Sequence, residues 1–458
     1  MTQPSATPKA VGSALALIGH TPMVELTAFD VGLCRLFLKL ENQNPGGSIK
    51  DRVARSMIEA AEADGRLKPG GTIVEATAGN TGLGLAQVAA TKGYRLILVV
   101  PDKMAREKIL HLRAMGVDVR LTRSDVGKGH PDYYQDLAQR VADETGGFYV
   151  NQFENPANPK AHETTTGPEI LEQVDGDLDA VVVGVGSGGT LTGLGRFLAA
   201  ASPKTRMVLA DPEGSILADY VATGRIGDAG SWIVEDFIPK NADMSLVSQA
   251  YTVSDRESVD TARELLRREG ILAGSSTGCL LAAALRYCRE QAEPKRVVTL
   301  ACDTGGKYLT KMFNDLWIAA QGFEDRPLTG RVIDLIPRPY AEGGVVAVGP
   351  DDTLLTAYNR MRSSDVSQLP VVEDGRLVGL LDESDLLAAV EHDDREHRFK
   401  RPVREAMTEK VKTLQAGDDL AKLTRVFDRG EVAVVVEGDR FVGVVTRVDL
   451  INHLRLYD

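Results

Sequence analysis

Lys50 is the side chain in this sequence with the clearest chemical potential. It ends the run 44–50 (NPGGSIK), in which Asn, Pro and Gly favour a turn, and the residues that follow favour a helix. A lysine amine presented at such a point can form a Schiff base with a carbonyl group. The position alone is weak support, because most lysines after glycine-rich turns are solvated surface charges.

A polar loop follows the expected strand 73–76 and opens a helix that continues from Leu83. The loop consists of Thr77, Ala78, Gly79, Asn80 and Thr81. Its hydroxyl, amide and N–H groups could grip a substrate carboxylate, and Asn80 could reach a cofactor ring oxygen. The alternative is an ordinary turn of Asn, Thr and Gly that caps a helix.

A glycine-rich loop follows the apolar strand 180–185 and opens the helix 191–200. Its residues are Gly186, Ser187, Gly188, Gly189 and Thr190. The backbone N–H groups of such a loop point at a bound anion, and the helix dipole adds partial positive charge. One amine, one polar loop and one phosphate-sized loop together indicate pyridoxal phosphate held on Lys50.

The same run also satisfies the dinucleotide-binding pattern G-x-G-x-x-G, which begins at Gly184. Asp211 closes the next expected strand about twenty residues later, as a nicotinamide cofactor would require. Against this competing interpretation, the loop lies deep in the chain instead of in its first strand-helix-strand unit. Ser187 and Thr190 also offer hydroxyls that suit a single terminal phosphate.

Short β-branched runs alternate with amphipathic stretches from Leu36 to about Leu316. This alternation predicts an α/β fold with a mostly parallel sheet covered by helices. A later stretch rich in Pro, Gly and charge marks a change of composition. We expect a catalytic domain at 1–325, a linker at 326–340 and a smaller domain at 341–458.

The smaller domain contains an internal repeat. Residues 371–387 match residues 435–451 at a fixed offset of 64, with eight of seventeen positions identical. Each copy has the pattern of a strand, a tight turn, a second strand and a helix. We expect the two copies to pack as a pseudo-symmetric α+β pair.

The composition excludes several classes of function. A net charge of -12 argues against nucleic acid as the main partner, and no apolar stretch is long enough to span a membrane. The first residues lack the apolar core of a signal peptide, so a cytoplasmic protein is expected. The cysteines show no metal-ligand or disulfide spacing, so no metal site is expected. They are Cys34, Cys279, Cys288 and Cys302.

Taken together, these motifs resemble the fold-type II pyridoxal-phosphate enzymes, which have a tryptophan synthase β-like fold, and within them the cystathionine β-synthases. The resemblance covers nearly the whole chain in the same order. The matching segments are LIGHTP (17–22), NPGGSIKDR (44–52), TAGNTG (77–82), PDKMAREK (101–108), NQFENPANPKAH (151–162), GSGGT (186–190), DPEGSILA (211–218), GSSTG (274–278) and YLTKMFNDLW (308–317).

The resemblance implies a β-replacement that joins serine, or an activated serine, to homocysteine and gives cystathionine, with hydrogen sulfide as a possible side product. It implies that Lys50 binds the cofactor and then removes the α-proton of the substrate. It places Ser276 against the pyridine nitrogen, and Gln152 beside the substrate. A neutral hydroxyl does not stabilise a protonated ring, so elimination is favoured over transamination.

The repeat resembles a pair of cystathionine-β-synthase-type domains, which often bind adenosyl ligands. Thr446 and Asp449 of the second copy match the ribose and phosphate signature, so adenosylmethionine or AMP is a candidate ligand. The first copy has Asp382 where a hydroxyl is expected, and this acid would repel a phosphate. A purely structural role for Asp449 as a helix cap is the alternative. A homodimer or homotetramer is expected.

Three departures from the family pattern leave other functions open. The Gly-Ile-Gly segment that family members commonly carry is missing before Glu235. Phe153 replaces a tyrosine, so an O-acetylserine sulfhydrylase is an alternative enzyme. A catalytically silent sensor of adenosyl ligands is the alternative outside enzymes. The N-terminus has no extension with Cys and His ligands, so no haem is expected.

Overall fold

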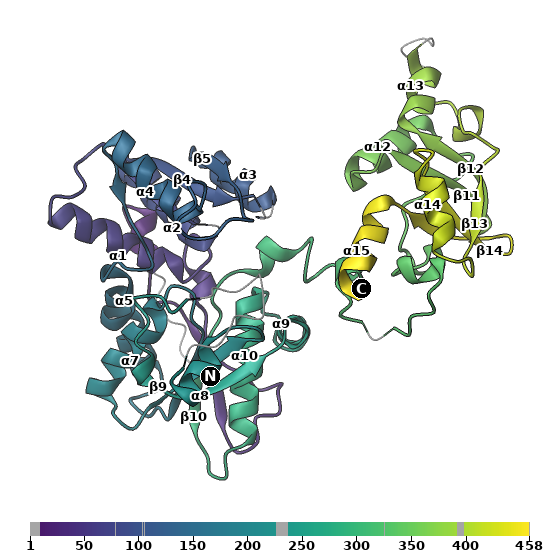
Figure 1. Ribbon diagram of the computed structural model, residues 1–458. Coiled ribbons are helices and arrows are strands. Elements are labelled where there is room, and N and C mark those ends of the chain that lie inside the picture. Colours follow the sequence, from purple (N-terminus) through teal and green to yellow (C-terminus); the bar gives the residue numbers. More distant parts are fainter. Residues whose placement is uncertain are drawn as a thin grey trace. The chain divides into compact units, whose positions relative to one another are not determined.

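The computed structural model describes residues 10–77, 79–102, 104, 106–225, 237–324, 326–391 and 398–457. The chain divides into two compact units, Met1–Leu309 and Thr310–Asp458 (Figure 1). Each unit has its own sheet structure and its own apolar core. Among the described helices, none combines the length and the apolar character that a membrane span requires.

The smaller sheet of the first unit has four parallel strands in the order β5-β4-β3-β6. Successive side chains of β3 point to opposite faces, so Ile73 packs with α1 and α2 while Val74 packs with α4. Burial on both faces explains the nearly continuous apolar run of β4, whereas the edge strand β5 is more polar and less buried. The elements are β3 (Thr72–Ala76), β4 (Arg95–Pro101), β5 (Asp118–Thr122), β6 (Phe148–Tyr149), α1 (Lys50–Ala63), α2 (Asn80–Lys92), α3 (Arg106–Ala114) and α4 (Tyr134–Thr145).

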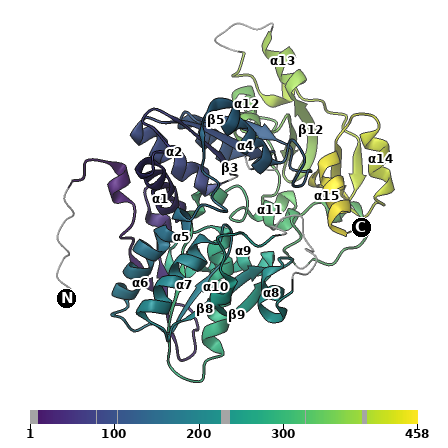
Figure 2. The same cartoon turned by 60° about the vertical axis from the view of Figure 1, so that its left-hand side comes forward.

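The larger sheet of the first unit has six strands in the order β1-β2-β10-β7-β8-β9. The pair β1-β2 is antiparallel and the other pairs are parallel. Figure 2 shows α7, α8 and α10 grouped around this sheet. The strands are β1 (Met23–Glu25), β2 (Arg35–Lys39), β7 (Ala180–Val183), β8 (Arg206–Pro212), β9 (Val247–Val253) and β10 (Arg296–Leu300). The helices are α5 (Ala157–Ala161), α6 (Gly167–Gln173), α7 (Gly189–Ala201), α8 (Leu217–Thr223), α9 (Asp255–Glu269) and α10 (Ser275–Arg289).

The α/β class and the mostly parallel pairing expected from the sequence are confirmed, but the strands form two sheets instead of one. The alternation of strands and helices in the sequence indicates that helices cover the strands. It does not indicate which strands pair with each other. Within the described residues, β3 pairs only with β4 and β6, so the smaller sheet stays separate from the larger one.

The second unit has a five-stranded sheet in the order β11-β12-β15-β14-β13. The expected repeat is confirmed, because β11, β12 and α13 recur as β14, β15 and α15. A register irregularity lies at Val371/Val372 in the first copy and at Val435/Val436 in the second, which is the same repeat position. The elements are α11 (Asp315–Ala320), α12 (Leu354–Ser364), β11 (Gln368–Glu373), β12 (Arg376–Asp382), α13 (Glu383–Glu391), β13 (Thr413–Gln415), α14 (Ala421–Phe427), β14 (Ala433–Glu437), β15 (Arg440–Val445) and α15 (Arg447–Tyr457).

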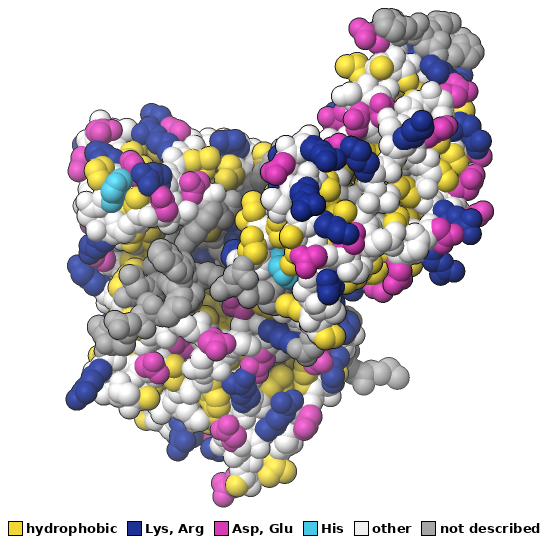
Figure 3. Space-filling view, turned by 45° about the vertical axis from the view of Figure 1, so that its right-hand side comes forward, with side chains coloured by type: hydrophobic (Ala, Val, Ile, Leu, Met, Phe, Trp, Pro, Cys, Tyr) yellow, Lys and Arg dark blue, Asp and Glu magenta, His cyan; other side chains and the backbone are white. Residues whose placement is uncertain are grey.

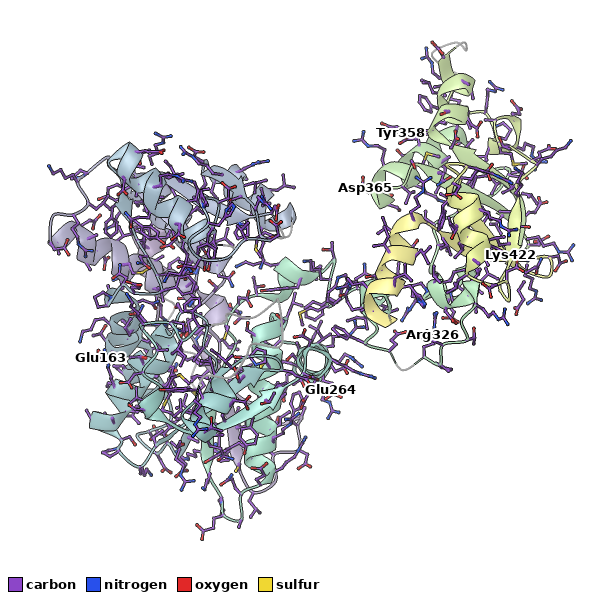
Figure 4. All side chains as sticks on the ribbon, in the orientation of Figure 1. Glu163, Glu264, Arg326, Tyr358, Asp365 and Lys422 are labelled. Carbon is purple, nitrogen blue, oxygen red and sulfur yellow. The ribbon has the colours of Figure 1, made fainter. Side chains whose placement is uncertain are left out.

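The described part of the segment expected to be a linker, residues 326–340, is folded into the second unit. Leu335 and Ile336 are buried in the apolar core of that unit. The side chain of Arg326, labelled in Figure 4, donates hydrogen bonds to the backbone oxygens of Ile333 and Ile336 at 3.2 and 2.6 Å. A composition rich in Pro and Gly is thus compatible with a tightly turned segment that completes a core. The boundary drawn from composition stays a prediction.

Basic and acidic side chains are interspersed over the face shown in Figure 3. On the second unit, several Lys and Arg side chains lie close together in this view, with Asp and Glu side chains around them. The expectation about nucleic acid drawn from the net charge of -12 stays a prediction.

Candidate functional site

Lys50 is the first residue of α1, and its side chain extends to the glycine-rich loop. The Lys50 Nζ lies 3.4 Å from the Ser187 Oγ, although 137 positions separate the two residues. Ser48 prepares the helix start, because its Oγ accepts a hydrogen bond from the Lys50 backbone N–H at 3.3 Å. Burial lowers the pKa of the Lys50 amine. A desolvated amine loses its proton more readily and becomes a better nucleophile and base.

The glycine-rich loop connects the end of β7 at Val183 with the start of α7 at Gly189. The strand ends two residues earlier and the helix begins two residues earlier than the sequence predicted. Within the described structure, the backbone N–H groups of residues 186–190 have no hydrogen-bond acceptor in the protein. The loop therefore presents unused donors at a helix N-terminus, as an anion site requires.

Two glycines of this loop are required by its surroundings. Gly188 has a φ of 84°, and a Cβ there would lie 2.5 Å from the Ala242 backbone nitrogen. A Cβ on Gly189 would lie only 1.9 Å from the Asn158 Oδ1. At Gly186, by contrast, a Cβ would have no atom within 4 Å. The loop is thus closely packed on its protein side and open at Gly186.

Two functional candidates behind this loop, Asn158 and His162, were not singled out individually by the sequence prediction. The Asn158 Nδ2 donates to the Ser187 Oγ at 2.8 Å, and its buried Oδ1 has no partner. The His162 Nε2 lies 3.3 Å from the Thr190 Oγ1, and burial holds the pKa of this histidine well below its usual range. Both belong to the run NPKAH, so a motif was visible while the individual contacts were not.

The polar loop between β3 and α2 is tied to the rest of the first unit by side-chain hydrogen bonds. The Asn80 Nδ2 donates to the Asp303 Oδ2 at 2.8 Å, and the Thr81 Oγ1 donates to the Gln152 Oε1 at 2.7 Å. The Gly79 backbone N–H donates to the Thr77 Oγ1 at 3.3 Å. Sequence-predicted residues from two distant segments, 77–81 and 152, are therefore brought together. Ala78 lies outside the described residues.

Gln152 also connects this loop to a buried carboxyl group on β3. Its backbone N–H donates to the Glu75 Oε2 at 3.2 Å, and the Ala76 N–H donates to the Glu75 Oε1 at 2.8 Å. Burial raises the pKa of Glu75 to about 8 despite these hydrogen bonds. The carboxyl group is therefore protonated over much of the neutral pH range, since its charged form is poorly solvated there.

Cys302, just after β10, connects the start of α1 with the start of α10. Its backbone oxygen accepts a hydrogen bond from the Ile49 N–H at 2.9 Å, and its N–H donates to the Thr277 Oγ1 at 3.1 Å. Lys50 follows Ile49 in the chain, and Ser276 precedes Thr277. Cys302 therefore anchors the backbone next to both candidate residues. Ser276 is the second residue of α10 and its side chain is exposed. No motif in the sequence singled out this bridging position.

A buried ionic network supports the start of α1. The Arg52 guanidinium donates to Glu41 at 2.8 Å and to Glu169 at 2.7 Å, and Lys39 donates to Glu169 at 2.8 Å. Burial alone would raise the pKa of Glu169, but hydrogen bonds from Arg52 and Lys39 lower it to about 2. Removing one partner of such a buried network leaves an uncompensated charge and is strongly destabilising. The network holds in place the helix that presents Lys50.

The residues of this site fit a pyridoxal phosphate group. Unpaired backbone donors, the Ser187 and Thr190 hydroxyls and the helix N-terminus match the needs of a phosphate ester. The space at Gly186 leaves the loop accessible, and Lys50 supplies the amine beside it. The Asn80 amide provides an N–H donor for a ring oxygen of the cofactor. Within the described residues no cluster of side chains is suited to a metal ion.

The two repeats of the second unit have different chemistry at equivalent positions. In the second copy, the Thr446 backbone N–H and Oγ1 both donate to the Asp449 Oδ2, at 2.7 and 2.6 Å. In the first copy, Asp382 and Asp385 exchange hydrogen bonds through their backbone N–H groups and carboxylates, at 3.3 and 2.8 Å. Thr446 and Asp449 are thus adjacent, and the Asp449 carboxylate also has the helix-capping contacts of the structural alternative.

The place before Glu235 where the Gly-Ile-Gly segment is missing falls within residues 226–236, which lie outside the described residues. The Phe153 ring is described, and it contacts the ring of Phe237 edge to face with centroids 5.8 Å apart. Phe153, which replaces the tyrosine of the family pattern, therefore packs against a second aromatic ring.

Comparison with known proteins identifies both units. The family model for pyridoxal-phosphate dependent enzymes matches residues 14–303, and the model for the CBS domain matches residues 339–392 and 403–456. The cystathionine beta-synthase of Dictyostelium discoideum is 34% identical over 95% of this chain and 91% of its own length. That of Saccharomyces cerevisiae is 32% identical over 96% of this chain and 97% of its own length.

Solved structures match about two thirds of the chain. The structure of O-ureido-L-serine synthase has a TM-score of 0.62 and 37% identity, over 67% of this chain and 96% of that one. A hydrogen sulfide-producing enzyme from Fusobacterium nucleatum has a TM-score of 0.59 and 36% identity, over 66% of this chain and 100% of that one. With relatives matched along nearly their whole length, the chain belongs to the cystathionine beta-synthase family of pyridoxal-phosphate-dependent enzymes.

Proposed function

We propose that this protein is a cystathionine β-synthase, which joins L-serine or an activated serine to L-homocysteine. The observation that carries the proposal is the Lys50 amine at 3.4 Å from Ser187, beside unpaired backbone donors at the start of α7. Full-length similarity to enzymes named cystathionine beta-synthase supports the same reaction. An amine next to an anion site is the arrangement that a phosphorylated aldehyde cofactor needs.

Pyridoxal phosphate, when bound, withdraws electrons from the α-carbon of an amino acid, so that the α-proton and the β-substituent can leave. Lys50 holds this group and, once displaced by the substrate amine, accepts the α-proton on its Nζ. Its lowered pKa favours that role, because a neutral amine can accept a proton and an ammonium cannot. Gly186, Ser187, Gly188, Gly189 and Thr190 hold the phosphate.

Ser276 is the proposed partner of the ring nitrogen. A hydroxyl at this point donates to the lone pair of a neutral ring nitrogen and does not stabilise a ring cation as a carboxylate would. Its position at the start of α10, anchored through Thr277 and Cys302, supports this role. The expected consequence is elimination and replacement at the β-carbon in preference to transamination.

The polar loop is the proposed site of the substrate carboxylate. Thr77, Gly79, Asn80 and Thr81 gather hydroxyl, amide and backbone N–H donors at the start of α2, and Gln152 orients Thr81 at 2.7 Å. We extend the assignment to Ala78 from the sequence. A carboxylate at a helix N-terminus is stabilised by the unpaired N–H groups and by the helix dipole.

A product assay with four substrate combinations tests the proposed reaction. Serine and O-acetylserine serve as donors, and homocysteine and sulfide serve as acceptors. We expect cystathionine from serine with homocysteine, with sulfide release as a slower side reaction. Turnover only with O-acetylserine and sulfide would identify an O-acetylserine sulfhydrylase instead. No product from any pair, in a protein that binds the cofactor, would indicate a catalytically silent protein.

For the repeat pair, we propose adenosyl-ligand binding at the second copy, with Thr446 and Asp449 as the contacts. The presence of CBS domains and the adjacency of these two side chains support it. Calorimetric titration with adenosylmethionine and with AMP tests the assignment, and Asp449→Asn should weaken whichever ligand binds. The absence of heat with both ligands would leave the Asp449 carboxylate as a helix cap only.

A further inference from the structure

Lys307 is a half-buried lysine that the proposed mechanism does not use. It lies in the short 3-10 helix Gly305–Tyr308, a few residues after β10. Its Nζ donates to the Asn80 Oδ1 at 2.8 Å and to the Gly46 backbone oxygen at 3.4 Å. Within the described structure Lys307 forms no ion pair, although Asp51 and Asp303 are close enough to attract it. A desolvated ammonium group directed at an amide oxygen needs an explanation.

The two ends of the Asn80 amide face neighbouring groups of opposite charge. Its Oδ1 accepts from the Lys307 ammonium, while its Nδ2 donates to the Asp303 carboxylate at 2.8 Å. The Tyr308 hydroxyl donates to the same Asp303 oxygen at 2.7 Å and fixes that carboxylate. Rotating the amide by half a turn would direct its nitrogen at a cation and its oxygen at an anion. Both contacts would become repulsive, so the orientation of the amide is determined.

The orientation matters because an amide nitrogen has two hydrogens. Asp303 accepts one of them, and the second remains for a ligand on the same side. The ring oxygen of pyridoxal phosphate carries negative charge when the cofactor is bound to an amine, so it needs a donor. The opposite orientation of Asn80 would present lone pairs to this anionic oxygen and would repel it.

We propose that Lys307 is a positioning residue that keeps the Asn80 nitrogen directed at the ring oxygen of the cofactor. The proposal depends on the proposed function, since it requires the cofactor to lie beside Asn80. Lys307 acts through Asn80 and does not itself contact the reacting atoms. Its effect should therefore vanish when Asn80 is removed.

A double-mutant cycle tests this dependence. The variants are Lys307→Met, Asn80→Ala and the combination, with Lys128→Met as the control for loss of an exposed lysine in the same unit. The dissociation constant of pyridoxal phosphate is measured by titrating each apoprotein and following the visible absorbance. We expect Lys307→Met to weaken binding about tenfold, the size of a hydrogen bond to a charged group. Lys128→Met should bind as the wild type does.

In the Asn80→Ala background, Lys307→Met should cause no further loss of affinity. An equal loss in both backgrounds would contradict the proposal, because Lys307 would then act independently of Asn80. Wild-type affinity in Lys307→Met would also contradict it. Lys307→Gln keeps an N–H donor for the Asn80 oxygen, so it should recover part of the affinity. This variant also serves as a second test should Lys307→Met fold poorly.

The wild-type protein separates the failure of this inference from the failure of the proposed function. If the wild type gives no visible band with pyridoxal phosphate, the proposed function is wrong and the inference falls with it. If the wild type binds the cofactor and Lys307→Met binds it equally well, only the role of Lys307 is wrong.

Discussion

The two loops of the candidate site have the same place in the fold and different chemistry. Each follows a parallel strand and opens a helix, one between β3 and α2 and the other between β7 and α7. In the first loop, the side chains of Asn80 and Thr81 are already bonded to Asp303 and Gln152. In the glycine-rich loop, the described backbone N–H groups have no acceptor in the protein.

This difference distinguishes a site for the phosphate of a cofactor that stays bound from a site for a substrate that is exchanged. Unpaired backbone donors cannot rotate away, so they suit a phosphate that remains bound through every turnover. In the polar loop, Asn80 keeps one amide hydrogen for the cofactor ring oxygen, and the backbone N–H groups at the start of α2 are left for a substrate that must leave. One type of strand-helix turn therefore serves two purposes, according to which side chains accompany its backbone donors.

The largest expected effect comes from Lys50→Ala, which removes the amine beside the glycine-rich loop. Activity should fall by roughly three orders of magnitude or more, because the group that accepts the proton is lost. The glycine-rich loop should still bind the cofactor weakly through its phosphate. Activity assays and visible spectra check the result, with Lys128→Ala as the control. Substantial remaining turnover in Lys50→Ala would contradict the assignment.

The next effect distinguishes the two sides of the glycine-rich loop. Gly189→Ala should destabilise the apoprotein by roughly 1–3 kcal/mol, because its Cβ would overlap the Asn158 Oδ1 at 1.9 Å. Gly186→Ala has open space and should leave the apoprotein stable while weakening cofactor binding. Thermal unfolding and cofactor titration measure the two effects. Equal behaviour of the two variants would refute the proposed orientation of the loop.

Thr81→Val tests the polar loop. The substitution removes the 2.7 Å hydrogen bond to the buried Gln152 and should raise the KM for the amino-acid donor about five- to tenfold. The visible absorbance of the bound cofactor should stay unchanged. Thr91→Val, at an exposed position of the same helix, is the matched control. A loss of cofactor without a change in KM would reverse the roles given to the two loops.

A prediction on pH dependence concerns Glu75, the carboxyl group on β3 that is hydrogen-bonded to the Gln152 backbone. Its pKa is about 8 in the folded protein against an ordinary value of 4.5. Between these values the folded chain keeps a proton that the unfolded chain has lost, so stability falls as the pH rises. Glu75→Gln should flatten this decline, and the exposed Glu144→Gln should not. Unfolding midpoints at several pH values check this, and parallel curves for both variants would contradict it.

The place of the glycine-rich loop between a strand and a helix could be predicted because it depends on consecutive residues. Gly188 needs a positive φ, Gly189 needs a missing Cβ, and the flanking strand and helix have strong local patterns. The repeat was predictable for the same reason, since a fixed offset of 64 is visible in the sequence alone. Local signals of this kind do not depend on knowing which distant segments meet.

The contacts between distant segments could not be predicted. Asn158 reaches Ser187 across 29 positions, and Arg52 reaches Glu169 across 117. Lys307 reaches Asn80 across 227 positions. Each pair depends on the order in which strands join the two sheets, and the alternation of strands and helices leaves that order open. For the same reason, the sequence singled out candidate site residues and left the contacts that hold them in place open.

The central claim is that the Lys50 amine binds pyridoxal phosphate covalently. Borohydride reduction of the protein loaded with cofactor, followed by proteolysis and mass spectrometry, locates the modified lysine directly. We expect the added mass on the peptide that contains Lys50. Modification of Lys307 or another lysine in its place, or the absence of any modified peptide from a protein with the visible band, would contradict the account.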